Sequence, residues 1–110
     1  VPGRNLHAIW DTGLAEQAIP SARPRLVRRY PAAERMGLDG GTAADWARES
    51  WQTARTFVYP AAFGRAGCPN GARGPIIWSR AATRASVPVV NRRITQAGLR
   101  LARLLDATLG

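Results

Sequence analysis

His7 and Asp11 are the residues of this 110-residue chain whose types and spacing indicate chemistry. They lie four positions apart, so on a helix both side chains project from the same face. A neutral imidazole nitrogen and a carboxylate oxygen are ordinary zinc ligands, and such a pair can hold one edge of a metal site. Zinc takes about four ligands in proteins. Since His7 is the single histidine and Cys68 the single cysteine, the pair supplies only part of a zinc shell.

Apolar spacing and the positions of Pro and Gly predict the helices that would carry these residues. The first helix spans about residues 6–19 and ends before Pro20, with Asn5 as its N-cap. His7 and Asp11 fall along one border of its apolar stripe. A short second helix is predicted at about residues 25–30, because Pro31 opposes its continuation toward Met36.

The third predicted helix has the clearest pattern, and it follows the glycines at positions 37, 40 and 41. Thr42 is its expected N-cap, and Asp45 in its first turn interacts favourably with the helix dipole. The apolar face from Trp46 to Val58 is predicted to lie in the core. The opposite face, predicted to be solvated, carries Arg48, Glu49, Gln52, Arg55 and Thr56.

The last predicted helix begins near Trp78, is interrupted or kinked at Pro88 and runs to about Leu109. Residues 60–75 before it are predicted to form a long loop that contains Cys68. The apolar stripe of this helix, predicted to face the core, carries Val90, Ile94, Ala97, Leu101, Leu104 and Thr108. Its other side, predicted to be exposed, carries Arg92, Arg93, Gln96, Arg100 and Arg103. With no alternating strand pattern, the fold class is all-α.

Length and composition narrow the possibilities further. The chain is long enough for one domain with a modest core. It contains no transmembrane segment, since no run reaches the roughly 18 apolar residues of a span, and no secretory signal pattern. The net charge is +9, and all 16 basic residues are Arg. Dispersed arginines of this kind form either a solvated basic surface or a patch that attracts phosphate.

Three segments resemble one known family. Residues 5–11, Asn-Leu-His-Ala-Ile-Trp-Asp, resemble the Asn-Leu-His-x-x-Trp-Asp motif of the zinc-dependent single-strand-specific nucleases of the S-one/P-one (S1/P1) family. Residues 46–50, Trp-Ala-Arg-Glu-Ser, look like its Trp-Ala-x-Glu-Ser segment. Residues 97–105 resemble its Ala-Gly-x-Arg-Leu-Ala-x-x-Leu closing helix, with Val-Pro-Val-Val at 87–90 upstream. The motifs occur in the family's order and span nearly the whole chain.

The resemblance implies an all-α, phospholipase C-like fold that carries three zinc ions in a cleft. It implies that His7 and Asp11 bind one of these ions, and that no other residue here inherits a catalytic role. Trp10 is expected to pack the ligand helix. The implied activity is metal-assisted hydrolysis of single-stranded DNA or RNA, and also of 3′-nucleotides, in a periplasmic or secreted protein, since family members are normally exported.

The other motif residues have structural roles by the same resemblance. Trp46, Glu49 and Ser50 are expected to serve helix packing and local hydrogen bonding. Arg100 is expected to bridge helices. Trp51 stands where several relatives have His, which removes a polar group but no known ligand.

The chain also departs from the family in what it lacks. Family members are more than twice as long, and most of their metal ligands precede the first motif, including a Gly-Asp-x-His-Gln-Pro-x-His segment with no counterpart here. Residues 1–110 are therefore expected to be the C-terminal portion of a single nuclease domain, with the N-terminal part of that domain as partner. With two ligands of one zinc ion, this portion is expected to be inactive alone. The absence should also expose apolar surface on the Trp46 and Val90 helices.

Three alternatives remain open at this point. A non-enzymatic basic helical module would bind nucleic acid or an anionic membrane through its arginines. A zinc phospholipase C relative would share the metal chemistry but cleave lipid. A truncated gene would leave a product without activity.

Overall fold

The N-terminal helix positions the candidate metal ligands. In the computed structural model, which describes residues 5–64, 76 and 78–110, α1 (Leu6–Ala8), η1 (Ile9–Leu14) and α2 (Ala15–Ser21) follow one another directly. Asn5 is the N-cap, and its Oδ1 accepts the Ala8 N–H at 2.8 Å, as predicted. The helix extends beyond its predicted end and includes Pro20. A proline there fixes φ near the helical value but lacks the N–H that would donate to the Glu16 carbonyl, and the helix ends one residue later, at Ser21.

The middle of this helix is wider than an ordinary α-helix. Residues of η1 form a π-helix, a rare geometry that is frequent at functional sites. Asp11 lies in this segment, while His7 precedes it in α1. The prediction that His7 and Asp11 share one face assumes a regular α-helix. A π-helix has more residues per turn, so it changes the direction of the Asp11 side chain relative to that of His7.

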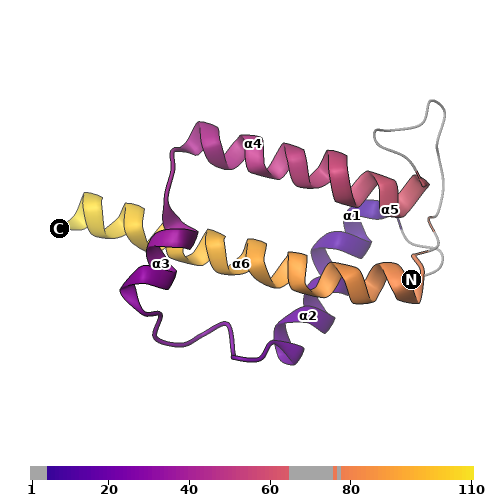
Figure 1. Ribbon diagram of the computed structural model, residues 1–110, viewed down its shortest axis with the longest axis horizontal. Helices are drawn as coiled ribbons and strands as arrows, with labels where there is room; N and C mark the ends of the chain where they lie inside the picture. The colour runs from indigo at the N-terminus through magenta and orange to yellow at the C-terminus, as the bar shows by residue number, and fades with distance from the viewer. Residues whose placement is uncertain (1–4, 65–75, 77) are drawn as a thin grey trace.

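The core lies where the N-terminal helix crosses the long C-terminal helix. Ile9, Leu14 and Ala18 are at most 2% exposed and cluster with Val58, Trp78 and Val90. In Figure 1 the long helix α6 (Arg80–Leu109) runs between α4 on one side and α2 and α3 on the other. All the elements of the described residues are helical, which confirms the all-α class.

The predicted helix at residues 25–30 is wrong. Residues 22–31 are an irregular connector, and the helix that follows is α3 (Ala32–Asp39), which begins after Pro31 rather than before it. Proline disfavours helical geometry in the residue before it and needs no N–H at a helix start, so Pro31 begins this helix. Its carbonyl accepts the Arg35 N–H at 2.9 Å.

The third predicted helix is confirmed, together with its N-cap. It comprises α4 (Ala43–Thr53), the π-helical η2 (Ala54–Val58) and α5 (Tyr59–Phe63). Thr42 and Asp45 form a reciprocal capping box, and Gly41 precedes it at φ +92°. A Cβ at Gly41 would lie 3.2 Å from the Trp46 indole nitrogen, so a glycine is needed there for space as well as for φ.

The predicted burial of this helix is wrong over most of its length. No residue of α4 is buried, and Trp51 is 58% exposed; only Val58, at the far end, belongs to the core. The predicted loop at 60–75 also begins later, because Pro60 lies inside α5. Because α5 continues η2 directly, Pro60 lies inside a continuous helix, and its missing N–H costs that helix one backbone hydrogen bond. Cys68 lies outside the described residues.

The last helix is confirmed, but its inward face is not the predicted one. α6 begins at Arg80, with Ser79 as N-cap, and runs through Pro88 without interruption. Pro88 is exposed, so its ring lies in solvent rather than in the core. Because proline has no backbone N–H, the helix has one hydrogen bond fewer at this point. Val90 is buried as predicted. Further along, Gln96 and Arg100 are buried, whereas Leu101, Leu104 and Leu105 are about half exposed.

The reason for this reversal is an ion-pair network between α6 and α4. The Arg100 Nη2 lies 2.6 Å from the Glu49 Oε2, and the Arg93 Nη1 lies 3.4 Å from the same oxygen. The Arg100 side chain is 8% exposed and its guanidinium lies 5.1 Å from the Trp46 ring centroid. The structural roles expected for Trp46, Glu49 and Arg100 are therefore confirmed.

The expected exposure of apolar surface is confirmed in part. Trp51 on the helix of Trp46 is exposed, and so are Leu101 and Leu105 on the helix of Val90. Val90 itself is buried. No described element covers the exposed leucines, because α6 meets α4 through its arginine side.

Loss of Glu49 should destabilise the chain strongly, because it leaves two guanidinium groups without their shared carboxylate. We expect Glu49→Ala to lower the free energy of unfolding by about 2–3 kcal/mol, somewhat below the cost of breaking a fully buried pair. Urea unfolding followed by circular dichroism measures this. The matched control is Glu34→Ala, which breaks the more exposed pair with Arg28 and should change little. Equal effects of the two variants would contradict the assignment.

The capping box should make stability depend on pH. The Thr42 N–H and hydroxyl donate to the Asp45 Oδ2 at 2.8 and 3.0 Å, and these bonds hold the pKa of the Asp45 carboxyl below its usual value. A lowered folded pKa contributes stability that is present above the unfolded pKa of about 3.9 and is lost as the pH falls through the folded value. Asp45→Asn should therefore be less stable than wild type at about pH 6 and converge on it near pH 2. If the difference in free energy of unfolding between wild type and Asp45→Asn stayed the same at acidic pH, this explanation would be contradicted. Asp106→Asn is the control, since Asp106 is not part of the capping box.

Candidate metal centre

The structure brings the two sequence-predicted ligands together. The His7 Nε2 lies 3.0 Å from the Asp11 Oδ2, and the side chains are 85% and 59% exposed. The widened helix therefore keeps the shared face that the four-residue spacing predicts. Both groups are accessible from solvent, so an ion can reach them without any rearrangement of the core.

Their separation fits a shared zinc ion. Bonds of about 2.0–2.2 Å at a tetrahedral angle place two ligand atoms about 3.3–3.6 Å apart, so the two exposed side chains need to separate by only a few tenths of an ångström to admit an ion. The pair fits one edge of such a site and no more. Within the described residues, no group of three or more His, Cys, Asp or Glu side chains could hold an ion. A role for His7 and Asp11 as metal ligands stays a prediction.

The pair opens onto a pocket of about 390 Å³. Three helical stretches enclose it: the start of the N-terminal helix, the α4–α5 region, and Arg93 from α6. Its lining residues are Leu6, His7, Trp10, Asp11, Ser50, Thr53, Ala54, Val58, Tyr59 and Arg93. The first motif and the Trp-Ala-x-Glu-Ser segment thus meet at one pocket.

Trp10 packs the ligand helix against its neighbour, as the sequence predicts. Its ring lies edge-on to Phe57, with centroids 6.4 Å apart and an interplanar angle of 60°. Trp10 belongs to η1 and Phe57 to η2, so this contact joins the two π-helical segments beside the pocket. Aromatic pairs in this geometry add about 0.5–1.5 kcal/mol beyond their burial.

Among the described residues that line this pocket, Arg93 supplies a guanidinium group, and three partners hold it in place. Its guanidinium donates to the Glu49 carboxylate, to the Gln96 side-chain oxygen at 3.0 Å, and to the Ser50 hydroxyl. The contact with Ser50 confirms the hydrogen-bonding role expected for that residue. Glu49 also neutralises Arg100, so the two guanidinium groups share one carboxylate and a net positive charge remains.

Sequence reasoning missed Arg93 because it placed the arginines of α6 on the solvent side. A signal was present in their spacing. Arg93, Gln96, Arg100 and Arg103 recur at intervals of three and four, which is the spacing of one helix face. An inward arginine face needs a carboxylate partner, and Glu49 in the second motif supplies it.

Trp51 does not enter the pocket. It is exposed, and the Arg55 guanidinium lies 5.2 Å from its ring centroid. Within the described part of the chain, none of the helices has the length and apolar character that crossing a membrane requires.

Comparison with known proteins gives one match. A family model described as S1/P1 Nuclease matches residues 2–110. Neither the curated proteins nor the solved structures contain a match to the chain. The family match covers nearly the entire sequence, including all three motifs and both candidate ligands.

Proposed function

The chain belongs to the S1/P1 nuclease family, and from this premise we propose that it is the C-terminal portion of a zinc-dependent nuclease domain. The substrate is single-stranded DNA or RNA, and also 3′-nucleotides, and the reaction is hydrolysis of the phosphate ester bond. The observation that carries the proposal is the His7–Asp11 pair, 3.0 Å apart and open to a pocket that also contains Arg93.

In this proposal His7 and Asp11 hold one zinc ion, and their remaining partners come from outside these 110 residues. Three ions are expected in the complete domain. Zinc held by His7 and Asp11 would activate water for hydrolysis near neutral pH and would offset the charge that develops on the phosphate. The chemistry of the donor set supports this assignment, since neutral imidazole and carboxylate oxygen are both good zinc ligands.

The other residues of the pocket bind and orient the substrate. Arg93 presents a fixed guanidinium, a planar group that matches two oxygens of a phosphate. Its contacts with Ser50, Glu49 and Gln96 hold it without substrate, so little side-chain freedom is lost on binding. Tyr59 brings an aromatic ring to the same pocket. A base can stack on such a ring only when it is not stacked between its neighbours in a duplex. This contact would therefore favour a single-stranded substrate over a duplex.

The alternatives make different predictions. A non-enzymatic basic module would bind nucleic acid or anionic membranes in a salt-sensitive way that neither a chelator nor His7→Ala affects. A zinc phospholipase C relative would cleave phospholipid micelles. The family match favours a nuclease over a phospholipase C. Since members of this family are generally exported, we propose a periplasmic or secreted location.

Zinc binding by the 110-residue chain tests the ligand pair directly. Two ligands give about half the free energy of a complete structural site, so we expect a dissociation constant on the order of 10⁻⁴–10⁻⁶ M. Isothermal titration calorimetry should show this binding lost in His7→Ala and kept in Glu16→Gln, which removes an exposed carboxylate of α2. Unchanged binding in His7→Ala would refute the assignment.

Activity should require the complete domain. The 110-residue chain with zinc should leave single-stranded DNA intact, because it holds too few ligands for a metal cluster. In the complete domain, His7→Ala should lower kcat/KM by more than the 10–100-fold that loss of an outer-shell partner causes. Zinc-dependent cleavage by the isolated chain would contradict the expected inactivity.

Arg93→Lys tests the phosphate contact in the complete domain. Lysine keeps the charge but loses the planar fork, so KM for an oligonucleotide should rise about tenfold. Arg92→Lys, at the neighbouring exposed position, is the control. If both variants behave like wild type, Arg93 has a structural role only.

A further inference from the structure

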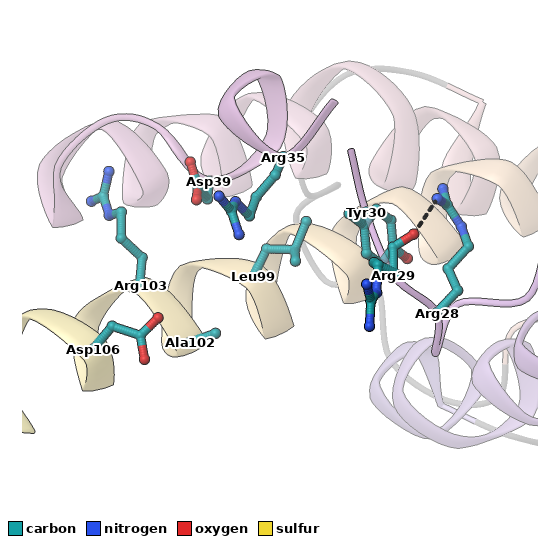
Figure 2. A pocket seen from close by; sticks show the side chains of 9 residues that line it. All are labelled: Arg28, Arg29, Tyr30, Arg35, Asp39, Leu99, Ala102, Arg103 and Asp106. Carbon is teal, nitrogen blue, oxygen red and sulfur yellow. Dashed lines mark hydrogen bonds between the residues drawn. The ribbon is translucent and has the colours of Figure 1, made fainter. Parts of the chain in front are cut away.

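A second pocket, of about 420 Å³, lies beside the C-terminal half of α6. It opens between α3, the connector of residues 22–31 and the C-terminal half of α6 (Figure 2). Its lining residues are Arg28, Arg29, Tyr30, Arg35, Asp39, Leu99, Ala102, Arg103 and Asp106. We call it the arginine pocket, because four of these nine side chains are guanidinium groups and two are carboxylates.

Two of the four arginines are held by other groups. Arg28 pairs with Glu34, and its guanidinium lies 3.8 Å from the Tyr30 ring centroid. The hydrogen bond from Arg28 lowers the pKa of the Glu34 carboxyl, and the same bond raises that of Arg28. Arg103 donates to the Gly41 carbonyl at 2.7 Å. These contacts fix the positions of Arg28 and Arg103 in the pocket, and the Glu34 carboxylate neutralises the charge of Arg28.

The other two, Arg29 and Arg35, have unused donors. Among the described residues, neither guanidinium makes an ion pair or a hydrogen bond as donor, although Asp39 and Asp106 line the same pocket. Both side chains are exposed and enter from the connector and from α3, opposite the apolar floor of Leu99 and Ala102 on α6 (Figure 2). A guanidinium offers five N–H donors and no acceptor, so two of them at one hollow favour an anion with several oxygens.

The arginine pocket opens on a different side of α6 from the metal pair, because it faces α3 and the connector whereas the first pocket faces α4 (Figure 1). Arg93 of the first pocket and Arg103 of the second lie on the same helix, ten residues apart, which is about 15 Å along its axis. A strand that joins the two pockets must cover this distance and also pass around α6, because Ala102 of the second pocket lies about half a helical turn round from Arg93. Only a strand longer than a few nucleotides can therefore occupy the metal pair and the second pocket together.

We propose that the arginine pocket is a subsite for the phosphate backbone of single-stranded nucleic acid, which holds the substrate several nucleotides from the metal pair. This proposal rests on the proposed nuclease function. Arg29 and Arg35 contact the phosphate oxygens, and Arg103 adds charge from the opposite wall. Asp39 and Asp106 line the same pocket and reduce its net positive charge.

Binding of a fluorescein-labelled oligothymidylate of about 12 nucleotides tests the proposal by fluorescence anisotropy. Arg29→Gln/Arg35→Gln in the 110-residue chain should weaken binding about tenfold and reduce the slope of log K against log salt by about 1.4, since each phosphate contact to a single strand contributes about 0.7. The matched control is Arg25→Gln/Arg84→Gln, which removes the same charge at two exposed positions outside the pocket and should change binding less than about twofold. Equal weakening by both double variants, or none in the first, would overturn the proposal.

Two further arms distinguish the source of the phosphate. Asp106→Asn should tighten oligonucleotide binding about threefold by removing a repulsive charge. Inorganic phosphate at millimolar concentration should compete poorly, because one phosphate gains only part of the contacts of a strand. Complete displacement of the oligonucleotide by inorganic phosphate at that concentration would show a site for free phosphate and refute a backbone subsite.

The complete domain separates this proposal from the proposed function. There Arg29→Gln/Arg35→Gln should lower kcat/KM for long single-stranded DNA about tenfold and leave hydrolysis of a dinucleotide unchanged, since a dinucleotide is too short to span both pockets. A loss on both substrates would overturn the subsite while leaving the nuclease assignment in place. A wild-type domain that hydrolyses neither substrate would refute the nuclease assignment, while the oligonucleotide binding of the chain would be unaffected.

Discussion

The carboxylate of Glu49 is the contact on which the arrangement of α4 and α6 depends. It accepts from Arg93 and Arg100, two guanidinium groups about two turns apart on α6, and the second of these is almost fully buried. Burial of charge is costly unless the charge is paired, so α6 cannot rotate its arginines inward without this partner. In Figure 1, α4 runs alongside α6. The side chains of Glu49, Arg93 and Arg100 connect the two helices, where apolar side chains would usually interdigitate.

This contact also decides what the first pocket contains. Because α6 turns Arg93 toward α4, a guanidinium lies beside the His7–Asp11 pair, fixed by Ser50 and Gln96 as well as by Glu49. The pair itself is carried by the N-terminal helix, whose buried side, Ile9 and Leu14, anchors it in the small core. The proposed metal ligands and the arginine proposed to bind phosphate thus come from helices far apart in sequence. The two interactions that join these helices are apolar packing and one shared carboxylate.

The same rotation leaves apolar surface uncovered. Leu101, Leu104 and Leu105 are about half exposed, and Trp51 is exposed on α4. Polar side chains occupy the inner face of α6 over this stretch, so its leucines point outward. The second pocket exists for a related reason: α3 begins after Pro31 and approaches α6 near Leu99, and the irregular connector before it brings Arg28 and Arg29 to the gap.

Much of this molecule could be predicted from local sequence alone. The helical class, the caps at Asn5 and Thr42, and the meeting of His7 with Asp11 depend on neighbours within about one turn, where backbone geometry leaves few choices. The path of α6 through Pro88 and the inward face of α6 were decided by tertiary structure. Hydrophobic spacing assumes that apolar residues face the core, and it fails where arginines find a carboxylate from another helix. The partner of a buried charge is a long-range contact, and only the fold brings Glu49 to Arg100.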